Sequence, residues 1–411
     1  MNSEAIFAMG LGLASPWEVT GVEFKDAGAL YTNRELHIQI GFTRGSQFLD
    51  ESGVLCDVHD TKEKVWRHLN FFQHKCYIHC QVPRIKTSQG KVLLVDVPWS
   101  RKESGFTLLF EGYALKLIEN EMPINKVGEV LGEYANRIWT IFNHWIGKAY
   151  KADEVDEIKA LGIDETSRKR GHEYLTVAVD LKSRRVIHAT PGKDSKTIDR
   201  IKEYLVEKGV NPMQIEHASI DLSPAFISGL ETNFPYAEIH FDRFHVKKLL
   251  NEAMDQLRQA ERKEHAALKG HKYTFLKNPE NLSAKRQDQL ADLIKLYPTL
   301  GEAYRLKVLF DDVWQMPTPE AAASFLEEWV AEVERQKIGP FMKFGRTIMA
   351  HKRGIINFCV TKISNGILEG INNKIQLAKR RARGYRNTDN FINMIYFLCS
   401  KLKFTYPLKT T

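Results

Sequence analysis

The spacing of apolar and polar residues predicts β-structure at the start of the chain. Apolar residues cluster in Trp17–Phe24 and then alternate with polar residues in Leu36–Phe42, as in a half-buried strand. The segment Lys25–Arg34 between them contains Gly and Asn, which favour turns. We therefore expect a β-hairpin over residues 16–42.

A helical period replaces this alternation after residue 123. Ile124, Val127 and Leu131 share one helical face, Gly132 ends the helix, and a second periodic stretch continues to Trp145. Two short helices around a turn with glycine are typical of a helix-turn-helix, whose second helix can enter a major groove of DNA. Many helical hairpins bind nothing, so the pattern alone leaves both interpretations open.

The middle of the chain alternates strands and helices. The order is three antiparallel strands, then a helix, a strand, a helix and a strand, which is the order of an RNase H-like α/β core with a mixed sheet flanked by helices. The expected elements are strands Ala160–Ile163, Tyr174–Val179 and Arg185–Ala189, helix Lys196–Lys208, strand Glu216–Ile220, helix Pro224–Glu231, strand Ala237–Phe241 and helix Arg243–Arg262.

These patterns divide the 411 residues into six segments. We expect a β-rich segment at 1–52, a zinc-ribbon-like domain at 53–112, a helix-turn-helix at 113–153, the first part of the catalytic core at 154–262, a helical insertion at 263–345, and the second part of the core with a basic helix at 346–411.

Four residues near the N-terminus have a spacing compatible with zinc. Cys56-x-x-His59 could supply half of a site, and Cys76-x-x-x-Cys80 the other half. Free cysteines are also commonly buried as small apolar residues. Both interpretations stay open at this point.

The charge is concentrated at the C-terminus. From Lys337 onward there are fifteen Lys and Arg against two acids, a net of +13, so the first 336 residues carry −5 of the whole chain's +8. Such a basic segment indicates a phosphate-binding surface, although a solvated helical face would look the same. The residues that we expect to contact DNA are Lys374, Lys379, Arg380, Arg381, Arg383, Arg386, the ring of Tyr385, and Arg137 in the helix-turn-helix.

Three acids are placed where they could form one site. Asp164 ends the first expected strand and Asp221 the fourth, and these strands are neighbours in an RNase H-like sheet. Glu369 lies in the first turn of the basic helix, for which Ser364 and Asn365 are N-cap candidates. Clustered carboxylates require cations, and oxygen ligands suit two Mg²⁺ or Mn²⁺ ions. Each acid taken alone could equally be a turn residue or a helix cap.

Composition restricts the setting. Apolar content is 43%, and no apolar run reaches the roughly 18–20 residues that cross a membrane. Five cysteines form no regular framework and are odd in number, which argues against a disulfide scaffold. We expect a cytoplasmic protein without a membrane partner.

Several blocks resemble bacterial insertion-sequence DDE transposases, most closely the ISL-three family. Leu161–Glu165 and Ser219–Phe226 resemble its first and second acid blocks. The other similar segments are Ser364–Gly370 with Asn373–Arg386 for the third block, Phe241–Val246 after the fifth strand, and Trp66–Phe72, Val97–Trp99 and Phe106–Glu111 in the N-terminal region.

The resemblance implies an enzyme that binds the terminal inverted repeats of its element, cuts there, and joins 3′-hydroxyl ends to target DNA. Asp164, Asp221 and Glu369 would be its catalytic, metal-binding triad, and the helix-turn-helix would help to read the repeats. Its partner would be double-stranded DNA, it would act in the bacterial nucleoid, and the pairing of two ends implies a homo-oligomer.

The chain departs from the family at its zinc-binding element. The second ligand pair is replaced by Lys86–Gly90, which contains neither Cys nor His. We therefore expect a packed N-terminal domain without zinc, with Zn²⁺ at Cys56, His59, Cys76 and Cys80 as the alternative.

Two other functions are compatible with part of the pattern. A regulator derived from an inactive transposase would bind DNA without cutting it, but all three acids are present. Another RNase H-like nuclease would use the same carboxylates, but would leave the N-terminal domains without a purpose.

Overall fold

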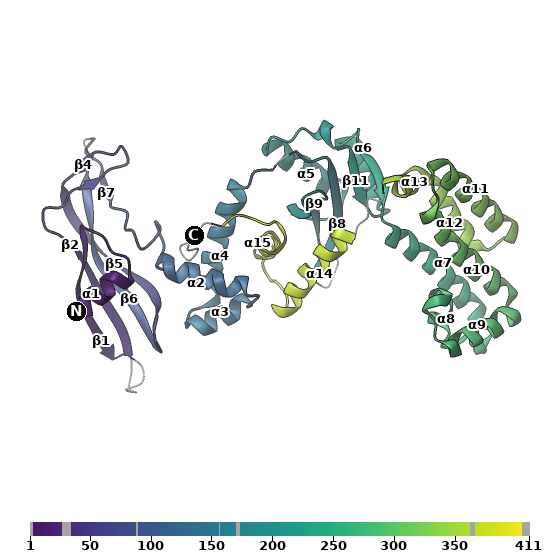
Figure 1. The fold of residues 1–411 in the computed structure, drawn as a ribbon, viewed down its shortest axis with the longest axis horizontal. Coiled ribbons are helices and arrows are strands. Elements are labelled where there is room, and N and C mark those ends of the chain that lie inside the picture. The colour runs from purple at the N-terminus through teal and green to yellow at the C-terminus, as the bar shows by residue number, and fades with distance from the viewer. Residues whose placement is uncertain are drawn as a thin grey trace. The chain divides into compact units, whose positions relative to one another are not determined.

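The computed structural model describes residues 3–26, 34–87, 89–155, 157–169, 173–361 and 366–404. The chain forms two compact units, one built on Met1–Lys151 and the other on Ala152–Leu402. Each is described separately below (Figure 1). No helix in the described ranges is long and apolar enough to cross a membrane.

The first unit contains a five-stranded sheet. The strand order is β1-β2-β6-β5, and β7 pairs with the C-terminal end of β6 at Arg84–Lys86. Among these pairs only β2 and β6 run parallel. The expected hairpin is confirmed as β1 and β2, while the residues at its turn, 27–33, lie outside the described ranges. The elements are α1 (Ser3–Gly10), β1 (Trp17–Asp26), β2 (Arg34–Phe42), β3 (Phe48–Leu49), β4 (Leu55–Cys56), β5 (Val58–Phe71), β6 (His74–Lys86) and β7 (Val92–Leu94).

The zinc-ribbon-like arrangement expected for residues 53–112 is not found. Its strands β5 and β6 belong to the same sheet as β1 and β2, so the expected boundary at residue 52 falls inside one folded layer. Cys76 and Cys80 pack in that sheet's core, whereas Cys56 lies in a separate cluster with Phe48. Burial raises the pKa of both core thiols to about 12, which disfavours the thiolate that zinc binds. With His59 they do not form a ligand group among the described residues.

Three helices complete the first unit. Apolar residues of α3 and α4, among them Val127, Ile138 and Phe142, are fully buried, as their helical period predicts. Gly132 ends α3 in the left-handed conformation (φ 67°), which glycine adopts without strain. The expected helix-turn-helix is therefore formed. Its helices are α2 (Leu108–Glu119), α3 (Ile124–Leu131) and α4 (Ala135–Ala152).

A buried ion pair joins this helical part to the sheet. Arg67 of β5, 2% exposed, pairs with Glu133 in the turn after α3, at 3.2 Å. The same guanidinium donates to the Leu131 carbonyl oxygen at 3.1 Å and to the Cys76 carbonyl oxygen at 3.3 Å. Buried charges are tolerated when they are paired in this way, so Arg67 fixes the helix-turn-helix against β5 and β6.

The second unit contains a mixed five-stranded sheet of order β10-β9-β8-β11-β12. β8, β9 and β10 are antiparallel neighbours, and β11 and β12 run parallel to β8, which matches the expected RNase H-like order. Its elements are β8 (Ala160–Lys169), β9 (Glu173–Asp180), β10 (Arg185–Pro191), α5 (Ser195–Glu207), β11 (His217–Ile220), α6 (Pro224–Asn233) and β12 (Glu238–Phe241).

Two C-terminal helices pack on this sheet, although they follow it by more than a hundred residues. α14 (Gly366–Arg381) lies along β8 (Figure 1). Leu368 of this helix is in close contact with Gly162 of the strand. α15 (Thr388–Cys399) packs on β10, where the Tyr396 hydroxyl accepts from the Ala189 N–H at 3.0 Å. The chain therefore returns to complete the core, as expected.

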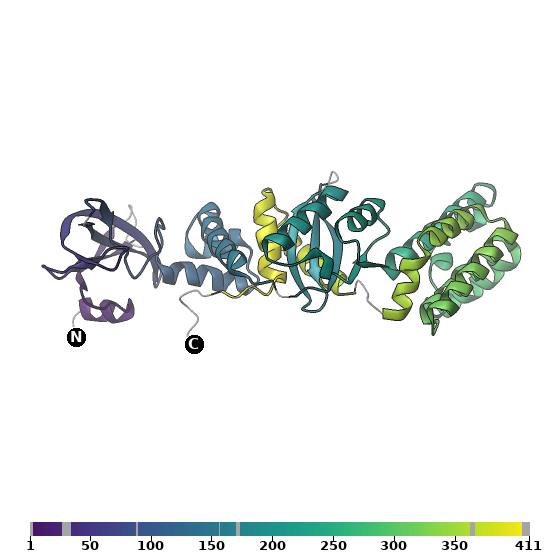
Figure 2. The same ribbon diagram turned by 90° about the horizontal axis from the view of Figure 1, so that it is seen from above.

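The insertion between these parts is a helical bundle over residues 243–361, so it extends beyond the expected 263–345 at both ends. Its core contains aromatic rings packed edge to face, including those of Phe310, Trp329 and Phe344. Figure 2 shows the helices side by side. They are α7 (Arg243–Glu264), α8 (Lys272–Leu276), α9 (Ala284–Leu296), α10 (Pro298–Leu309), α11 (Pro319–Gln336), α12 (Gly339–Ala350) and α13 (Lys352–Thr361). Short 3₁₀ turns lie at Pro212–Gln214, Ala266–Leu268, Pro279–Asn281 and Phe310–Gln315.

The packing of α13 on β12 makes a specific demand on Gly354. A Cβ at this buried position would overlap the ring of Phe241 and lie 3.1 Å from the carbonyl oxygen of Ile239. We expect Gly354→Ala to lower the free energy of unfolding by about 1–3 kcal/mol through overpacking, measured by urea denaturation. Gly370→Ala on α14, where nothing lies within 4 Å of the added Cβ, is the control and should not destabilise the protein.

Candidate active site

The parallel strands place three aspartates in one row. The pairs His217↔Ala160 and Ser219↔Gly162 fix the register of β11 on β8, and its continuation sets Asp221 level with Asp164. On the other side, β12 pairs with β11 up to Phe241, and the next residue, Asp242, donates its N–H to the Ile220 carbonyl oxygen at 3.0 Å. Neighbours in a row project to the same face of a sheet, so the three carboxylates share one surface.

Asp164 is not at a strand end, contrary to the sequence prediction. β8 continues to Lys169 because its other edge stays paired with β9, where Asp164 lies opposite Val177. Only the pairing with β11 stops near Asp164. The apolar run Ala160–Ile163 therefore predicted the part of β8 that is paired on both edges. It did not predict the extension to Lys169, which is paired with β9 alone.

The row is electrostatically strained. Burial raises the pKa of Asp164 to about 6, and the negative charges of Asp221 and Asp242 add to the effect. The Glu165 N–H, which donates to the Asp164 carboxylate at 2.7 Å, and the nearby charge of His245 act in the opposite direction. Burial and the charge of Asp221 also raise the pKa of Glu165. Such a cluster is stabilised by cations.

Asp242 and His245 form a second part of the site. The Asp242 carboxylate caps α7 by accepting from the Phe244 N–H at 3.0 Å, and its other oxygen lies 3.0 Å from His245 Nδ1. This hydrogen bond is the main cause that raises the pKa of His245. In the sequence these residues stood out only through the family resemblance. An acid directly after a buried strand, with His three residues later on a helix, is the signal that could have identified them.

α14 contacts β8 through polar side chains as well as Leu368. Asn372 Nδ2 donates to the Asp164 carboxylate, and Gln376 Nε2 donates to Thr166 Oγ1 at 2.8 Å. Gly162, Asp164 and Thr166 alternate along the strand and so face this helix together. The expected juxtaposition of the C-terminal helix with the first acid is therefore present.

Glu369 lies on this helix but is exposed. It precedes Gln376 by seven residues, close to two helical turns, and so lies on the same strip of α14. Asn372, between them, is the residue that contacts Asp164. Among the described residues Asp164, Asp221 and Glu369 do not have ligand atoms gathered within 4.8 Å of one another. The structure thus brings the helix of Glu369 to β8, but the three carboxylates are not gathered into one ligand group.

Several lysine and arginine side chains of the basic C-terminal segment are exposed to solvent. Lys374, Arg380, Arg381, Arg383 and Arg386 are all exposed. Lys379, by contrast, donates to the Ser167 carbonyl oxygen at 2.6 Å and to Ser167 Oγ at 3.0 Å. Most of the side chains that we expect to bind phosphates are therefore accessible, and one of them also holds α14 to β8.

Tyr385 does not have the exposed ring that was predicted to stack on a base. It is 8% exposed and stacks on Phe391, with ring centroids 4.8 Å apart, and burial raises its pKa to about 12. Gly384 (φ 94°) turns the chain after α14. Arg168 then holds the turn by donating to the carbonyl oxygens of Tyr385 and Arg386. The ring is thus part of the core.

On α4 the exposed face includes Asn136, Arg137, Thr140, His144 and Lys148. The Arg137 guanidinium is paired with the Glu133 carboxylate and lies 4.3 Å from the centroid of the Phe106 ring. Its charge is therefore already partly engaged within the protein. Asn136 and Thr140, near the start of the helix, present hydrogen-bonding groups where helix-turn-helix proteins contact bases.

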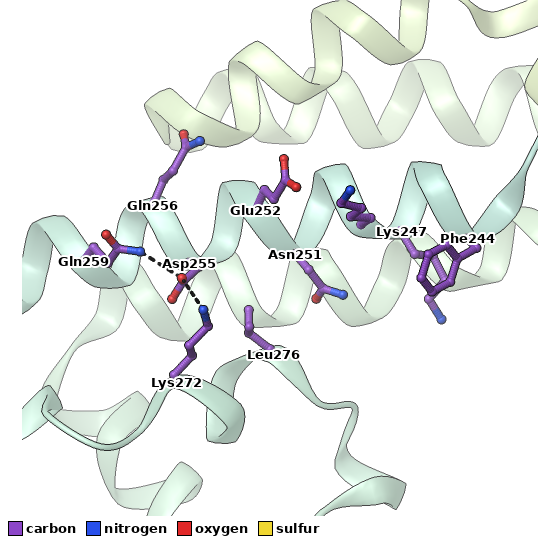
Figure 3. A pocket seen from close by; sticks show the side chains of 10 residues that line it. Phe244, Lys247, Asn251, Glu252, Asp255, Gln256, Gln259, Lys272 and Leu276 are labelled. Atoms are coloured by element: carbon purple, nitrogen blue, oxygen red, sulfur yellow. Dashed lines mark hydrogen bonds and ion pairs between the residues drawn. The ribbon is translucent and has the colours of Figure 1, made fainter. Parts of the chain in front are cut away.

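A groove of about 650 Å³ lies along α7 and α8 of the insertion (Figure 3). Asp255 in this groove accepts from Gln259 at 2.8 Å and pairs with Lys272 at 3.2 Å. Lys247 is likewise paired with Asp311, at 2.9 Å. Because two of its lysines are neutralised by acids, the groove lacks the net charge expected of a phosphate site.

Comparison with known proteins identifies similar sequences over both units. Residues 161–395 match the ISL3 DDE family model described as a transposase, and residues 95–146 match the helix-turn-helix domain of transposase family ISL3. The transposase for insertion sequence element IS1557 of Mycobacterium tuberculosis is 26% identical over 83% of each chain. The transposase for IS1001 of Bordetella parapertussis is 25% identical over 91% of this chain and 94% of the relative.

The raised pKa of Asp164 makes a prediction about stability. The pKa of Asp164 is about 6 in the folded protein and near 3.8 in the unfolded chain. Its protonated carboxyl therefore stabilises the fold at pH values below 3.8, and this contribution is lost as the pH rises through about 6. We expect Asp164→Asn, without divalent cations, to raise the free energy of unfolding by about 1–3 kcal/mol at pH 7.5 and by much less at pH 4. Denaturant melts at the two pH values measure this. An equal effect from the exposed control Asp288→Asn would contradict the explanation.

Proposed function

Because the chain belongs to the ISL3 family of DDE insertion-sequence transposases, we propose that it binds the terminal inverted repeats of its element, cleaves DNA there and joins the 3′-hydroxyl ends to target DNA. The observation that supports this most directly is the row of Asp164, Asp221 and Asp242 across parallel strands, beside the helix that carries Glu369. A row of partly buried carboxylates destabilises a fold in the absence of cations, so its presence favours a catalytic use.

We assign Asp164, Asp221 and Glu369 as the ligands of two Mg²⁺ or Mn²⁺ ions. Their donors are all carboxylate oxygens, and the raised pKa of Asp164 supports the assignment, because a cation beside this carboxylate would offset its burial. When bound, two such ions activate the attacking oxygen and stabilise the leaving oxygen at phosphorus. For Glu369 to take part, its exposed side chain must turn toward the row, which its position one turn from Asn372 allows.

Residues around the ligands have roles of their own. Asn372 and the Glu165 N–H orient Asp164 by donating to its two carboxylate oxygens, one to each, and the remaining lone pairs of these oxygens can bind a cation. His245 is held through Nδ1 by Asp242, and its raised pKa keeps it protonated to higher pH than an ordinary histidine. Protonated His245 would carry an N–H at Nε2, a suitable donor to a phosphate oxygen or to a leaving oxyanion.

DNA binding is divided between the two units in this proposal. Asn136 and Thr140 on α4 read base edges in the repeats, because their side chains are exposed near the start of the second helix. Exposed cations of the C-terminal segment contact phosphates close to the cleavage site. Pairing of two element ends requires at least two copies of the protein on DNA.

Cleavage assays test the catalytic assignment. Wild type incubated with labelled element-end duplexes and Mg²⁺ or Mn²⁺ should release cut ends and join them to target DNA. We expect Asp164→Asn, Asp221→Asn and Glu369→Gln each to lower the rate by at least roughly 10²-fold while leaving DNA binding intact. Asp389→Asn changes the other acid of the C-terminal segment and should keep wild-type activity.

The same assay separates the alternatives. Wild-type rates in the Asp164→Asn protein would refute the assignment of this carboxylate. Binding at element ends with no cutting by wild type would indicate a regulator. Preference for four-way junctions over repeat ends would indicate a different RNase H-like nuclease.

Salt dependence tests the proposed phosphate-binding arginines. Replacement of Arg380, Arg381 and Arg383 together by Ala should weaken binding to duplex DNA and reduce the slope of log K against log salt by about 0.9 for each phosphate that the variant no longer neutralises. Lys379→Ala is the comparison, because Lys379 is already bonded to Ser167 and should change the slope less. An unchanged slope in the triple variant would place these arginines away from the DNA backbone.

A further inference from the structure

Two histidines and a glutamate form a cluster at the opposite end of the short parallel strands. In the register of β11 and β12, His217 pairs with Glu238, and His240 lies two residues further along. One ligand atom of each residue lies within 4.8 Å of the other two. His217 precedes Asp221 by four residues, about 13 Å along a strand, and His240 precedes Asp242 by two, about 7 Å, so the cluster lies next to the carboxylate row and shares no residue with it.

The hydrogen bonds of His240 fix its tautomer. Its Nδ1 lies 3.2 Å from Thr361 Oγ1, and this hydroxyl donates its own proton to the Asn357 carbonyl oxygen at 3.1 Å, so it accepts from His240. Nδ1 therefore carries the proton, and the lone pair of Nε2 points to His217 Nδ1 at 3.1 Å. The ring is fully buried, and burial lowers its pKa to about 4, so it is neutral at pH 7. A neutral imidazole with its other nitrogen bonded to the protein is the usual form of a metal ligand.

The third group completes a set that suits a transition metal. Glu238 Oε2 lies 3.9 Å from His217 Nδ1. Ligands at about 2.0–2.1 Å from a tetrahedral ion are roughly 3.4 Å apart, and the two measured separations lie on either side of this value. Mg²⁺ prefers oxygen ligands only, so two imidazoles disfavour it at this site and favour a transition metal such as zinc. We propose that His217, Glu238 and His240 bind one Zn²⁺ ion, with water as its fourth ligand.

A second histidine pair in the same protein lacks this arrangement. His37 Nδ1 and His79 Nε2 are 2.7 Å apart, but the nearby carboxylate of Glu35 is on the other ring nitrogen of His37, at 3.7 Å. The charge of Lys25 also opposes a cation there. Proximity of two imidazoles is therefore insufficient by itself, and the His37–His79 pair provides an internal control.

The Zn²⁺ ion would be structural. It would join β11 to β12, two strands of four residues each, and through Thr361, which is hydrogen-bonded to His240, it would join both strands to the end of α13. These strands lead directly into Asp221 and Asp242, so zinc would stabilise the part of the sheet that carries two acids of the row.

Metal titration of the full-length chain tests the proposal. After chelator treatment and dialysis, wild type should bind one equivalent of Zn²⁺ by calorimetry and should show visible d–d absorption of tetrahedral Co²⁺ when Co²⁺ replaces Zn²⁺. His217→Ala and Glu238→Gln, which alter partly exposed side chains, should weaken this binding at least roughly 10-fold. His79→Gln should bind like wild type, and so should Asp164→Asn, which separates this site from the proposed catalytic metals.

Circular dichroism of each variant confirms that it is folded before titration. Equal Zn²⁺ binding in wild type, His217→Ala and Glu238→Gln would overturn the proposal, because the ion would then be held elsewhere, for example by thiols. Absence of Zn²⁺ binding in wild type would also overturn it and would leave a hydrogen-bonded histidine pair. Loss of catalysis with zinc binding intact would instead count against the proposed function alone.

Discussion

The parallel pairing of β11 with β8 and β12 is the constraint on which the candidate site depends. A register shift of one residue would turn Asp221 to the opposite face from Asp164, because side chains alternate along a strand. Ile163 and Ile220, next to these acids, are fully buried and hold this register. The same shift would move one of them out of the apolar layer in which both now pack. The apolar core thus outweighs the repulsion between the carboxylates, and the row lowers the local stability of the sheet.

Much of the fold could be predicted because its signals are local. Apolar periods indicated the hairpin, the helix-turn-helix and the order of the sheet, and the strand ends correctly placed Asp221. The extension of β8 beyond Asp164 was missed, since its pairing with β9 depends on a neighbour that sequence spacing does not reveal. The zinc-ribbon-like interpretation of Cys76 and Cys80 was not supported for the same reason: both alternate into a core that is built from distant strands.

The roles of individual side chains were harder to predict than the elements that carry them. Tyr385 follows a basic helix and looked available to a base, but a turn at Gly384 stacks it on Phe391. Asn372 and His245 are important only because of their contacts. Asn372 is bonded to Asp164, which is distant in the chain, and His245 is bonded to Asp242, the residue that caps α7. The positions of charged residues are evident from the sequence. It does not show which charges the protein has already neutralised, as for Arg137.

The path of the chain through the insertion has a mechanical consequence. The chain leaves the sheet through Asp242, which caps α7, a helix of 22 residues and therefore about 33 Å in length. It returns through α13, which is packed against the same strand, β12, around Gly354. Strand β12 is therefore held at both the departure and the return of the bundle. A displacement of α7 or α13 relative to the sheet would therefore strain β12 and Asp242, so the geometry of this edge of the aspartate row depends on how the bundle is packed.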